Sequence, residues 1–155
     1  MVRKKADRMS DLAVTVFRLN GVLTSWGDDF SAPEGLSSAR WQMLGAVALA
    51  DRPSTTPQIA ARMGVTRQGA QKQLNALVEA GLMEVRPNPL HKRSPLYLLT
   101  QQGQTAFDAM DKRWRAHAAR TAASFDDAEL DTALKVLTGL IDLYASAKQE
   151  PHDEA

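Results

Sequence analysis

The sequence predicts a mainly α-helical fold with one small β-hairpin, in which a winged helix-turn-helix is flanked by a long helix at each end of the chain. A short helical segment, a glycine turn and a second helical segment lie together around Gly64. Apolar and charged residues then alternate over 83–86, and a second apolar run returns at 96–99. Near both chain ends apolar residues recur every three or four positions, which is typical of amphipathic helices.

The first two helices are predicted by this spacing and by their end signals. The apolar repeat that starts at Met9 predicts a helix of roughly five turns that stops near Gly27. Proline and glycine fall together over 32–35, which favours a loop. Ser37 or Ser38 then caps the second helix.

A short helix, a tight turn and a longer helix follow. We expect Thr56 to be the N-cap of the short helix, with Pro57 at its first helical position. Gly64 follows its last turn and supplies the positive φ that redirects the chain. Thr66 caps the longer helix, which Gly81 closes.

The hairpin and the last two helices complete the chain. Met83 and Val85 alternate with charged neighbours, as in a half-buried strand. A turn follows around Asn88, which stands between two prolines, and Thr100 caps a long helix after the second strand. The last helix begins at an acidic cluster, which we interpret as favourable charge at a helix N-terminus rather than as a metal site: Asp126, Asp127, Glu129 and Asp131.

The composition excludes several classes of protein. The chain has 155 residues, of which 44% are hydrophobic and 24% charged, so it is long and apolar enough to bury a core. The absence of cysteine excludes a disulfide scaffold, a thiol nucleophile, a cysteine redox switch and Cys-ligated zinc. The basic N-terminal residues precede a polar stretch, and no apolar run is long enough for a membrane span, so we expect a cytoplasmic protein without a membrane partner.

The formal net charge of +1 hides an uneven distribution. Residues 1–53 carry seven basic and six acidic side chains, whereas residues 54–100 carry six basic and only two acidic ones. Residues 101–155 carry six basic and ten acidic side chains. A cationic middle segment indicates a local anionic partner.

The helix that follows Gly64 carries a polar face with no acidic residue before Glu79. A solvated helix face usually mixes both signs of charge, so this composition favours nucleic acid over an ordinary solvated surface. Arg and Lys suit guanine, and Gln and Asn suit adenine. The face consists of Thr66, Arg67, Gln68, Gln71, Lys72 and Asn75.

The hairpin tip beside this helix supplies a second set of candidate DNA contacts. A basic hairpin alone is more often an ordinary surface loop, but next to a basic helix face its cations suit a minor groove or phosphates. The tip residues are His91, Lys92, Arg93 and Ser94.

Four segments in the same order resemble the MarR (multiple antibiotic resistance regulator) family of winged-helix transcription regulators, and the resemblance covers almost the whole chain. They are the runs LSSARWQML at 36–44, IAARMGVTR at 59–67 and LVEAGL at 77–82, and the segment from Asn88-Pro89 through Lys92-Arg93-Ser94 to Gly103. The resemblance implies a homodimer that binds a pseudo-palindromic operator in double-stranded DNA, as a repressor released by a small molecule.

The resemblance also implies roles for individual positions. Thr66, Arg67, Gln68, Gln71 and Lys72 would face the major groove, and Arg93 would reach the minor groove from the hairpin. The family commonly has an acid two residues before this arginine, where this chain has His91. A histidine gives no permanent ion pair, so we expect either that the hairpin tip is held less tightly or that the protonated ring contacts a phosphate.

The terminal helices carry stripes that are too apolar for isolated surface helices. They could pack against each other within one chain, but the winged core is complete without them and the family dimerises in this way, so we expect dimerisation helices. The stripe residues are Leu12, Val16, Phe17, Leu23, Leu137, Ile141 and Tyr144. The expected organisation is 1–35 N-terminal dimerisation helix and loop, 36–100 DNA-binding domain, 101–149 C-terminal linker and dimerisation helices, and 150–155 flexible tail.

Large apolar residues near the expected junction of these helices with the winged domain are candidates for an effector pocket, and plain core packing is the alternative. They are Trp26, Phe30, Trp41, Met43, Met110 and Trp114. A small aromatic or apolar ligand would fit such a junction and shift the recognition helices.

Two other function classes remain for comparison. An enzyme is disfavoured because the three histidines are widely separated and no phosphate-binding glycine loop or His pair with metal spacing exists, so no catalytic residue, cofactor or metal is predicted. A winged-helix protein–protein adaptor without DNA readout is the stronger alternative. An adaptor would have apolar or acidic residues on the helix that follows Gly64, and four residues there argue against it: Arg67, Gln68, Gln71 and Lys72.

Overall fold

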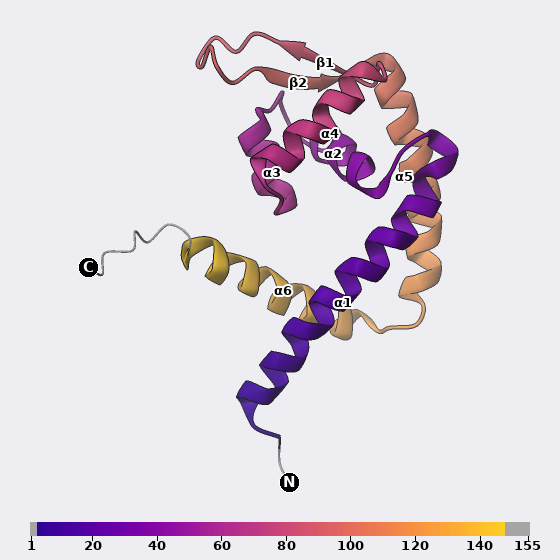
Figure 1. Cartoon of the computed structure of the whole chain (residues 1–155). Coiled ribbons are helices and arrows are strands. Elements are labelled where there is room, and N and C mark those ends of the chain that lie inside the picture. The colour runs from indigo at the N-terminus through magenta and orange to yellow at the C-terminus, as the bar shows by residue number, and fades with distance from the viewer. Residues whose placement is uncertain (1–2, 148–155) are drawn as a thin grey trace, which may run out of the picture. The chain divides into compact units, whose positions relative to one another are not determined.

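In residues 3–147, which the computed structural model describes, six α-helices and one antiparallel hairpin follow one another in the predicted order (Figure 1). The tail predicted at 150–155 lies outside these residues. The elements are α1 (Lys5–Ser31), a 3-10 helix η1 (Ala32–Glu34), α2 (Ser38–Ala48), α3 (Thr56–Met63), α4 (Arg67–Glu79), β1 (Met83–Arg86), β2 (Leu96–Leu99), α5 (Gln101–Ala122) and α6 (Asp127–Ala147).

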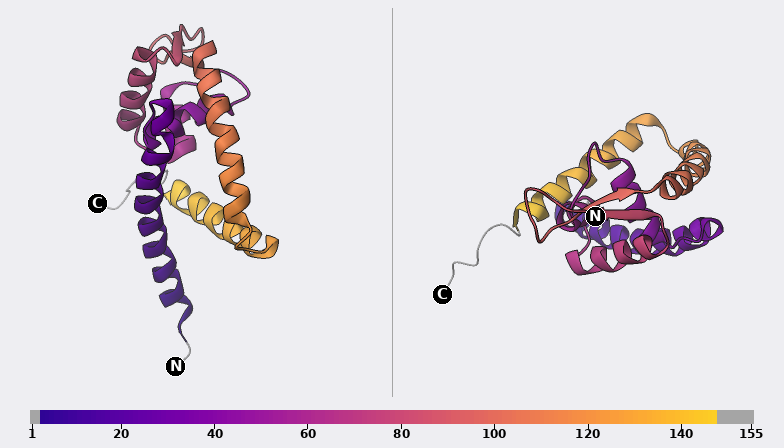
Figure 2. Two further views of the ribbon diagram at one scale, coloured as in Figure 1. Left: turned by 90° about the vertical axis from the view of Figure 1, so that its right-hand side faces the viewer. Right: turned by 90° about the horizontal axis from the view of Figure 1, so that it is seen from above.

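The chain divides after Asp111 into two compact units. In the first unit α2, α3 and α4 pack against one another beside the hairpin (Figure 2). The strands pair in a register from Met83–Leu99 to Arg86–Leu96. Fully buried apolar side chains from these elements and from the first half of α5 form one core: Leu44, Ile59, Leu74, Leu77, Met83 and Met110.

The first helix does not stop near Gly27, so that part of the prediction is wrong. α1 continues to Ser31, and Gly27 is buried inside it. A β-carbon at Gly27 would lie 2.7 Å from Ser38 Oγ, so the glycine permits a close crossing of α1 and α2 and does not end the helix. Asp28 secures the same crossing, since its Oδ1 accepts a hydrogen bond from the Ser38 backbone N–H at 2.7 Å.

The helix-turn-helix follows its local signals with one exception. Gly64 has φ of +64°, and the Thr66 hydroxyl accepts a hydrogen bond from the Gly69 N–H at 3.0 Å, as predicted. The predicted N-cap of α3 is wrong by one residue, because Thr55 is the cap and its N–H donates to Gln58 Oε1 at 2.9 Å. Thr56 is thereby placed in the first turn.

In the second unit the acidic cluster starts α6. Glu129 N–H donates to Asp126 Oδ1 at 2.8 Å, and Asp126 N–H donates to Glu129 Oε2 at 3.0 Å. This reciprocal pair is a capping box, which confirms the interpretation as a helix start. Within residues 3–147 no three acidic or histidine side chains are grouped for a metal ion, and no described helix is long and apolar enough to cross a membrane.

Candidate nucleic-acid interface

Helix α4 turns one face to the core and the other to solvent. Ala70, Leu74 and Leu77 are fully buried, and the polar residues between them are exposed because the helical repeat places them on the opposite side. The exposed residues of this face, with the N-cap, are Thr66, Arg67, Gln68, Lys72 and Asn75.

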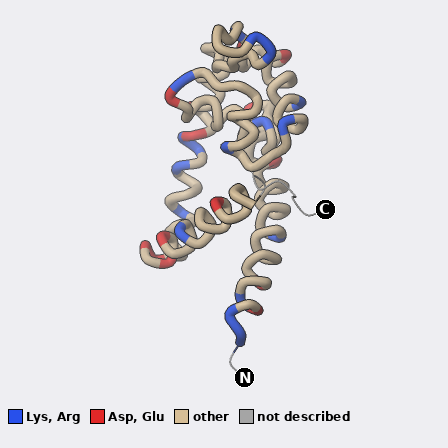
Figure 3. Tube along the Cα trace, turned by 90° about the vertical axis from the view of Figure 1, so that its left-hand side faces the viewer, with Lys and Arg blue, Asp and Glu red and all other residues tan. Residues whose placement is uncertain are grey.

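The cations of α4 and of the hairpin tip are not neutralised by carboxylates. Within residues 3–147 the side chains of Arg67, Lys72, Lys92 and Arg93 form no ion pair or hydrogen bond. In β1, by contrast, Arg86 pairs with Glu84. Figure 3 shows the positions of the basic and acidic residues along the chain. The charge on α4 and on the tip is therefore available to an anionic partner.

The tip of the hairpin, residues 87–95, is organised by Asn88. Its Nδ2 donates to the Ser94 carbonyl at 2.9 Å, and its Oδ1 accepts from the Leu90 N–H at 3.1 Å. Asn88 is 9% exposed, whereas His91, Lys92 and Arg93 are exposed. No role for this side chain was predicted from the sequence, although an asparagine in a proline-bounded turn is a local signal for such bonds.

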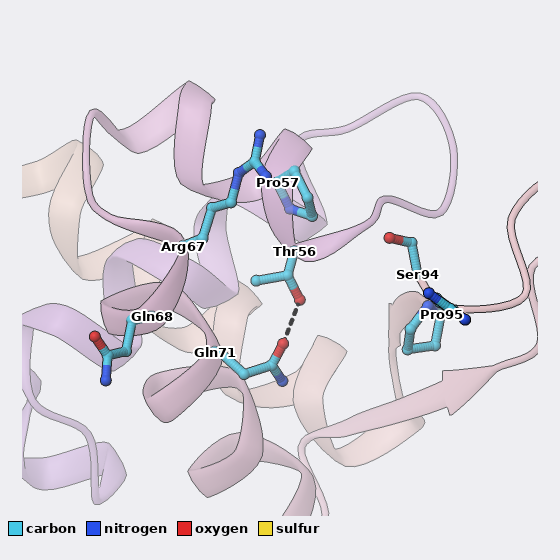
Figure 4. A pocket seen from close by; sticks show the side chains of 8 residues that line it. Thr56, Pro57, Arg67, Gln68, Gln71, Ser94 and Pro95 are labelled. Atoms are coloured by element: carbon cyan, nitrogen blue, oxygen red, sulfur yellow. Dashed lines mark hydrogen bonds between the residues drawn. The ribbon is translucent and has the colours of Figure 1, made fainter.

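A hollow of about 330 Å³ separates the start of α4 from the hairpin tip (Figure 4). Arg67 and Gln68 line it from α4, and Arg93 lines it from the tip. Two arginines from different elements therefore border one concave surface. The remaining lining residues are Thr56, Pro57, Gln71, Ser94 and Pro95, of which Thr56, Pro57 and Pro95 were not candidates from the sequence.

Gln71 differs from its neighbours on α4 because its amide is engaged within the protein. Its Oε1 accepts a hydrogen bond from Thr56 Oγ1 at 2.8 Å (Figure 4), and its Nε2 donates to the Tyr97 hydroxyl at 2.7 Å and to Asn75 Oδ1 at 2.8 Å. These partners come from α3, β2 and the next turn of α4. Gln71 thus links three elements at the hollow.

Three of the residues predicted for an effector pocket form an aromatic cluster at the junction of α1 and α2. The ring centroids of Trp26 and Phe30 lie 4.6 Å apart and stack, and those of Phe30 and Trp41 lie 5.3 Å apart. All three side chains are partly exposed. The cluster therefore presents an aromatic surface as well as packing against the core.

The other three residues predicted for this pocket are placed differently. Met43 and Met110 are 2% and 0% exposed and fill the core. Trp114 belongs to the second unit, where its ring lies 5.7 Å from that of His117.

The predicted dimerisation stripes remain largely uncovered. On α1 Phe17 is 78% exposed and Leu23 is 49% exposed, while on α6 Ile141 and Tyr144 are 67% and 68% exposed. Leu12, Val16 and Leu137 are partly buried. Val14, Val22, Leu134 and Leu143 extend these exposed apolar surfaces. Each of the two helices therefore carries several exposed apolar side chains.

Comparison with known proteins agrees with this geometry. A model of the MarR family matches residues 34–94, which contain the helix-turn-helix and most of the hairpin. An uncharacterized protein of Mycobacterium tuberculosis is 41% identical over 136 residues, covering 88% of this chain and 94% of that protein. The relation therefore extends over both units.

Two crystal structures resemble the whole fold. The MarR family transcription regulator SP03579 is 27% identical, with a TM-score of 0.75 and coverage of 94% of this chain and 97% of that one. The M. tuberculosis regulator MosR in complex with DNA is 25% identical, with a TM-score of 0.73 and coverage of 89% and 98%. The chain is not an enzyme; it belongs to the MarR family of winged helix-turn-helix, DNA-binding transcription regulators.

Proposed function

We propose that the protein is a homodimeric repressor that binds a pseudo-palindromic operator in double-stranded DNA and leaves it when a small aromatic or apolar ligand binds. The observation that carries the DNA part of this proposal is the hollow bordered by Arg67 on α4 and Arg93 on the hairpin tip, neither of which has a carboxylate partner within residues 3–147.

Helix α4 is proposed to enter the major groove. Gln68 and Asn75 are amide side chains on its exposed face, and such groups hydrogen-bond to base edges. Lys72 on the same face supplies a cation for a neighbouring phosphate. Thr66 and Arg67 stand at the N-terminal end of the helix, where backbone N–H groups and the helix dipole favour phosphate. This arrangement would place base reading on one helix face and phosphate contacts at its start.

The hairpin tip is proposed to follow the adjacent minor groove. Arg93 supplies the cation that enters the groove, while Lys92, His91 and Ser94 lie beside it for phosphate contacts. The hollow between α4 and the tip would then span the sugar–phosphate backbone that separates the two grooves. MosR, which has the same fold, was crystallised with DNA.

The homodimer is proposed from the apolar surfaces of α1 and α6. Exposed Phe17, Ile141 and Tyr144 would be costly in a monomer, and association of two copies removes them from water. A twofold dimer presents two recognition helices about one helical turn of DNA apart, which matches a pseudo-palindromic site.

Release by a ligand is proposed from the cluster of Trp26, Phe30 and Trp41. A flat apolar molecule can stack on partly exposed aromatic rings. The cluster lies where α1 meets α2, so a ligand there can alter the position of the winged helix relative to α1. Titration of aromatic compounds into the operator complex tests this part, with Phe30→Ala expected to remove the response.

Selection from random duplex DNA tests the central proposal. We expect enrichment of two inverted half-sites with centres about 10 base pairs apart, and affinity that falls steeply with added salt. An adaptor without DNA readout would enrich no sequence and would show weak, unspecific binding only. No enriched sequence, or only weak binding that is the same for every duplex, would reject the DNA-binding proposal.

A further inference from the structure

We infer that Gln71 is a positioning residue, which fixes the hairpin against α4, and that it does not read bases, although it lies on the recognition helix. This inference rests on the proposed function and assigns Thr56 and Tyr97 as its partners. Its hydrogen bonds reach residues 15 positions before and 26 positions after it in the chain.

The amide of Gln71 has little hydrogen-bonding capacity left for a base. Reading adenine takes one amide N–H and the amide oxygen together. In this protein both hydrogens of Nε2 are used, at 2.7 Å to Tyr97 and at 2.8 Å to Asn75, and Oε1 accepts from Thr56 at 2.8 Å. A base contact by this amide would have to replace bonds that hold three elements together.

The partners of Gln71 are themselves firmly held. Tyr97 is 3% exposed, and its backbone N–H donates to the Ser54 carbonyl at 2.9 Å. Thr56 is 8% exposed in the first turn of α3. Two buried groups from separate elements therefore meet one amide on α4, and this junction ties β2 to the recognition helix.

The hollow explains why this junction matters for DNA binding. Arg67 and Arg93 border it from α4 and from the hairpin tip. Gln71, four residues after Arg67 on α4, lines the same hollow (Figure 4). A protein that holds two grooves of one duplex at once must keep its two contact elements at a fixed separation. Loosening Gln71 would weaken both contacts on every sequence without altering which base is preferred.

Gln68 is the matched residue on the same helix. It is exposed, lines the same hollow, and within residues 3–147 its side chain forms no hydrogen bond. Gln68 and Gln71 thus carry the same amide group, but only the amide of Gln71 forms hydrogen bonds within residues 3–147. The substitution Gln→Met removes the amide at either position and keeps the length of the side chain.

The experiment compares three variants of the full-length protein: Gln71→Met, Tyr97→Phe and Gln68→Met. Selection from random duplexes measures base preference, and gel-shift titration measures affinity. Hydrogen exchange without DNA measures how firmly the hairpin is held. We expect Gln71→Met to bind all duplexes about tenfold more weakly, with unchanged base preference and faster exchange of the β2 amides. Tyr97→Phe should act in the same direction, since it removes the hydroxyl that accepts a hydrogen bond from Gln71 Nε2. Because the Tyr97 ring is buried, this effect cannot come from a lost DNA contact. Gln68→Met should alter the preference at one position of each half-site and leave hairpin exchange unchanged.

A changed base preference in Gln71→Met overturns the inference. Hairpin amides that exchange as slowly in both Gln71→Met and Tyr97→Phe as in the parent protein overturn it as well. The exchange measurement needs no DNA, so it decides the positioning role even if the parent protein enriches no sequence. That last outcome would reject the proposed function alone.

Discussion

Gly27 of α1 faces Ser38 of α2 so closely that a β-carbon on the glycine would lie 2.7 Å from the serine hydroxyl oxygen and 3.1 Å from its β-carbon. Asp28, the next residue, accepts a hydrogen bond from the Ser38 backbone N–H. The end of α1 is therefore joined to the start of α2 by one close contact and one charged cap. This joint lies beside the aromatic cluster proposed to bind the ligand.

Gly27→Ala should destabilise the protein by about 1–3 kcal/mol, because the added methyl group overpacks a buried crossing. Gly21→Ala is the matched control, since a β-carbon at Gly21, in the same helix, would meet nothing within 4 Å. That control should stabilise by about 0.5–1 kcal/mol through helix propensity. Urea denaturation measures both, and equal free energies of unfolding for the two variants would contradict the close crossing.

Asn88→Ala should weaken operator binding several-fold with little loss of global stability, because it frees the hairpin tip and leaves the core intact. Asn88→Asp separates the two bonds, since it keeps the acceptor for the Leu90 N–H and loses the donor to the Ser94 carbonyl. We expect an intermediate affinity for it in gel-shift titration. Parental affinity of Asn88→Ala would show that the tip needs no such support.

Arg93→Ala should weaken operator binding by at least an order of magnitude, about 1.4 kcal/mol or more, and His91→Ala should weaken it much less. Both side chains are exposed at the tip, and Arg93 also lines the hollow opposite α4. Gel-shift titration of the two variants against the parent provides the measurement. Equal affinity of Arg93→Ala and the parent would remove the hairpin from the proposed interface.

Lys72→Ala should lower affinity for all duplexes and reduce the slope of log K against log salt by about one, since one phosphate contact is lost. Lys72 is exposed on α4 and, within residues 3–147, forms no ion pair. Lys135→Ala on α6 is the control for a lysine outside the proposed interface and should leave the slope unchanged. Binding isotherms at several salt concentrations give both slopes.

Phe17→Asp and Ile141→Asp should each convert the dimer into single chains of 17.0 kDa, because a carboxylate in an apolar interface is poorly solvated. Leu49→Asp is the control, since Leu49 is 76% exposed at the end of α2, outside both stripes. Deletion of residues 1–10 or 140–155 should also give monomers. Analytical ultracentrifugation decides: a Phe17→Asp or Ile141→Asp protein that still sediments as a dimer removes that helix from the interface.

Local signals predicted the elements of this chain well. Gly64, Thr66, Gly81 and Thr100 act where the sequence places them, because a glycine turn or a hydroxyl cap is satisfied within four residues of itself. The polar face of α4, which has no acidic residue before Glu79, was likewise predicted from residue types and helical spacing alone. Thr56 was predicted as the cap because two consecutive threonines offer the same hydroxyl group, whereas the capping box with Gln58 makes Thr55 the cap.

The sequence alone determined the helix order, the hairpin, the cationic face of α4 and the resemblance to the MarR family, since each depends on residue type and short-range periodicity. The tertiary structure decided that Gly27 lies at the crossing of α1 and α2 and that Asn88 holds the hairpin tip. It also decided that the Gln71 amide forms hydrogen bonds within the protein, whereas the Gln68 amide forms none within residues 3–147. The two glutamines are alike in sequence. Only the approach of Thr56 and Tyr97, brought close by packing from distant parts of the chain, distinguishes them.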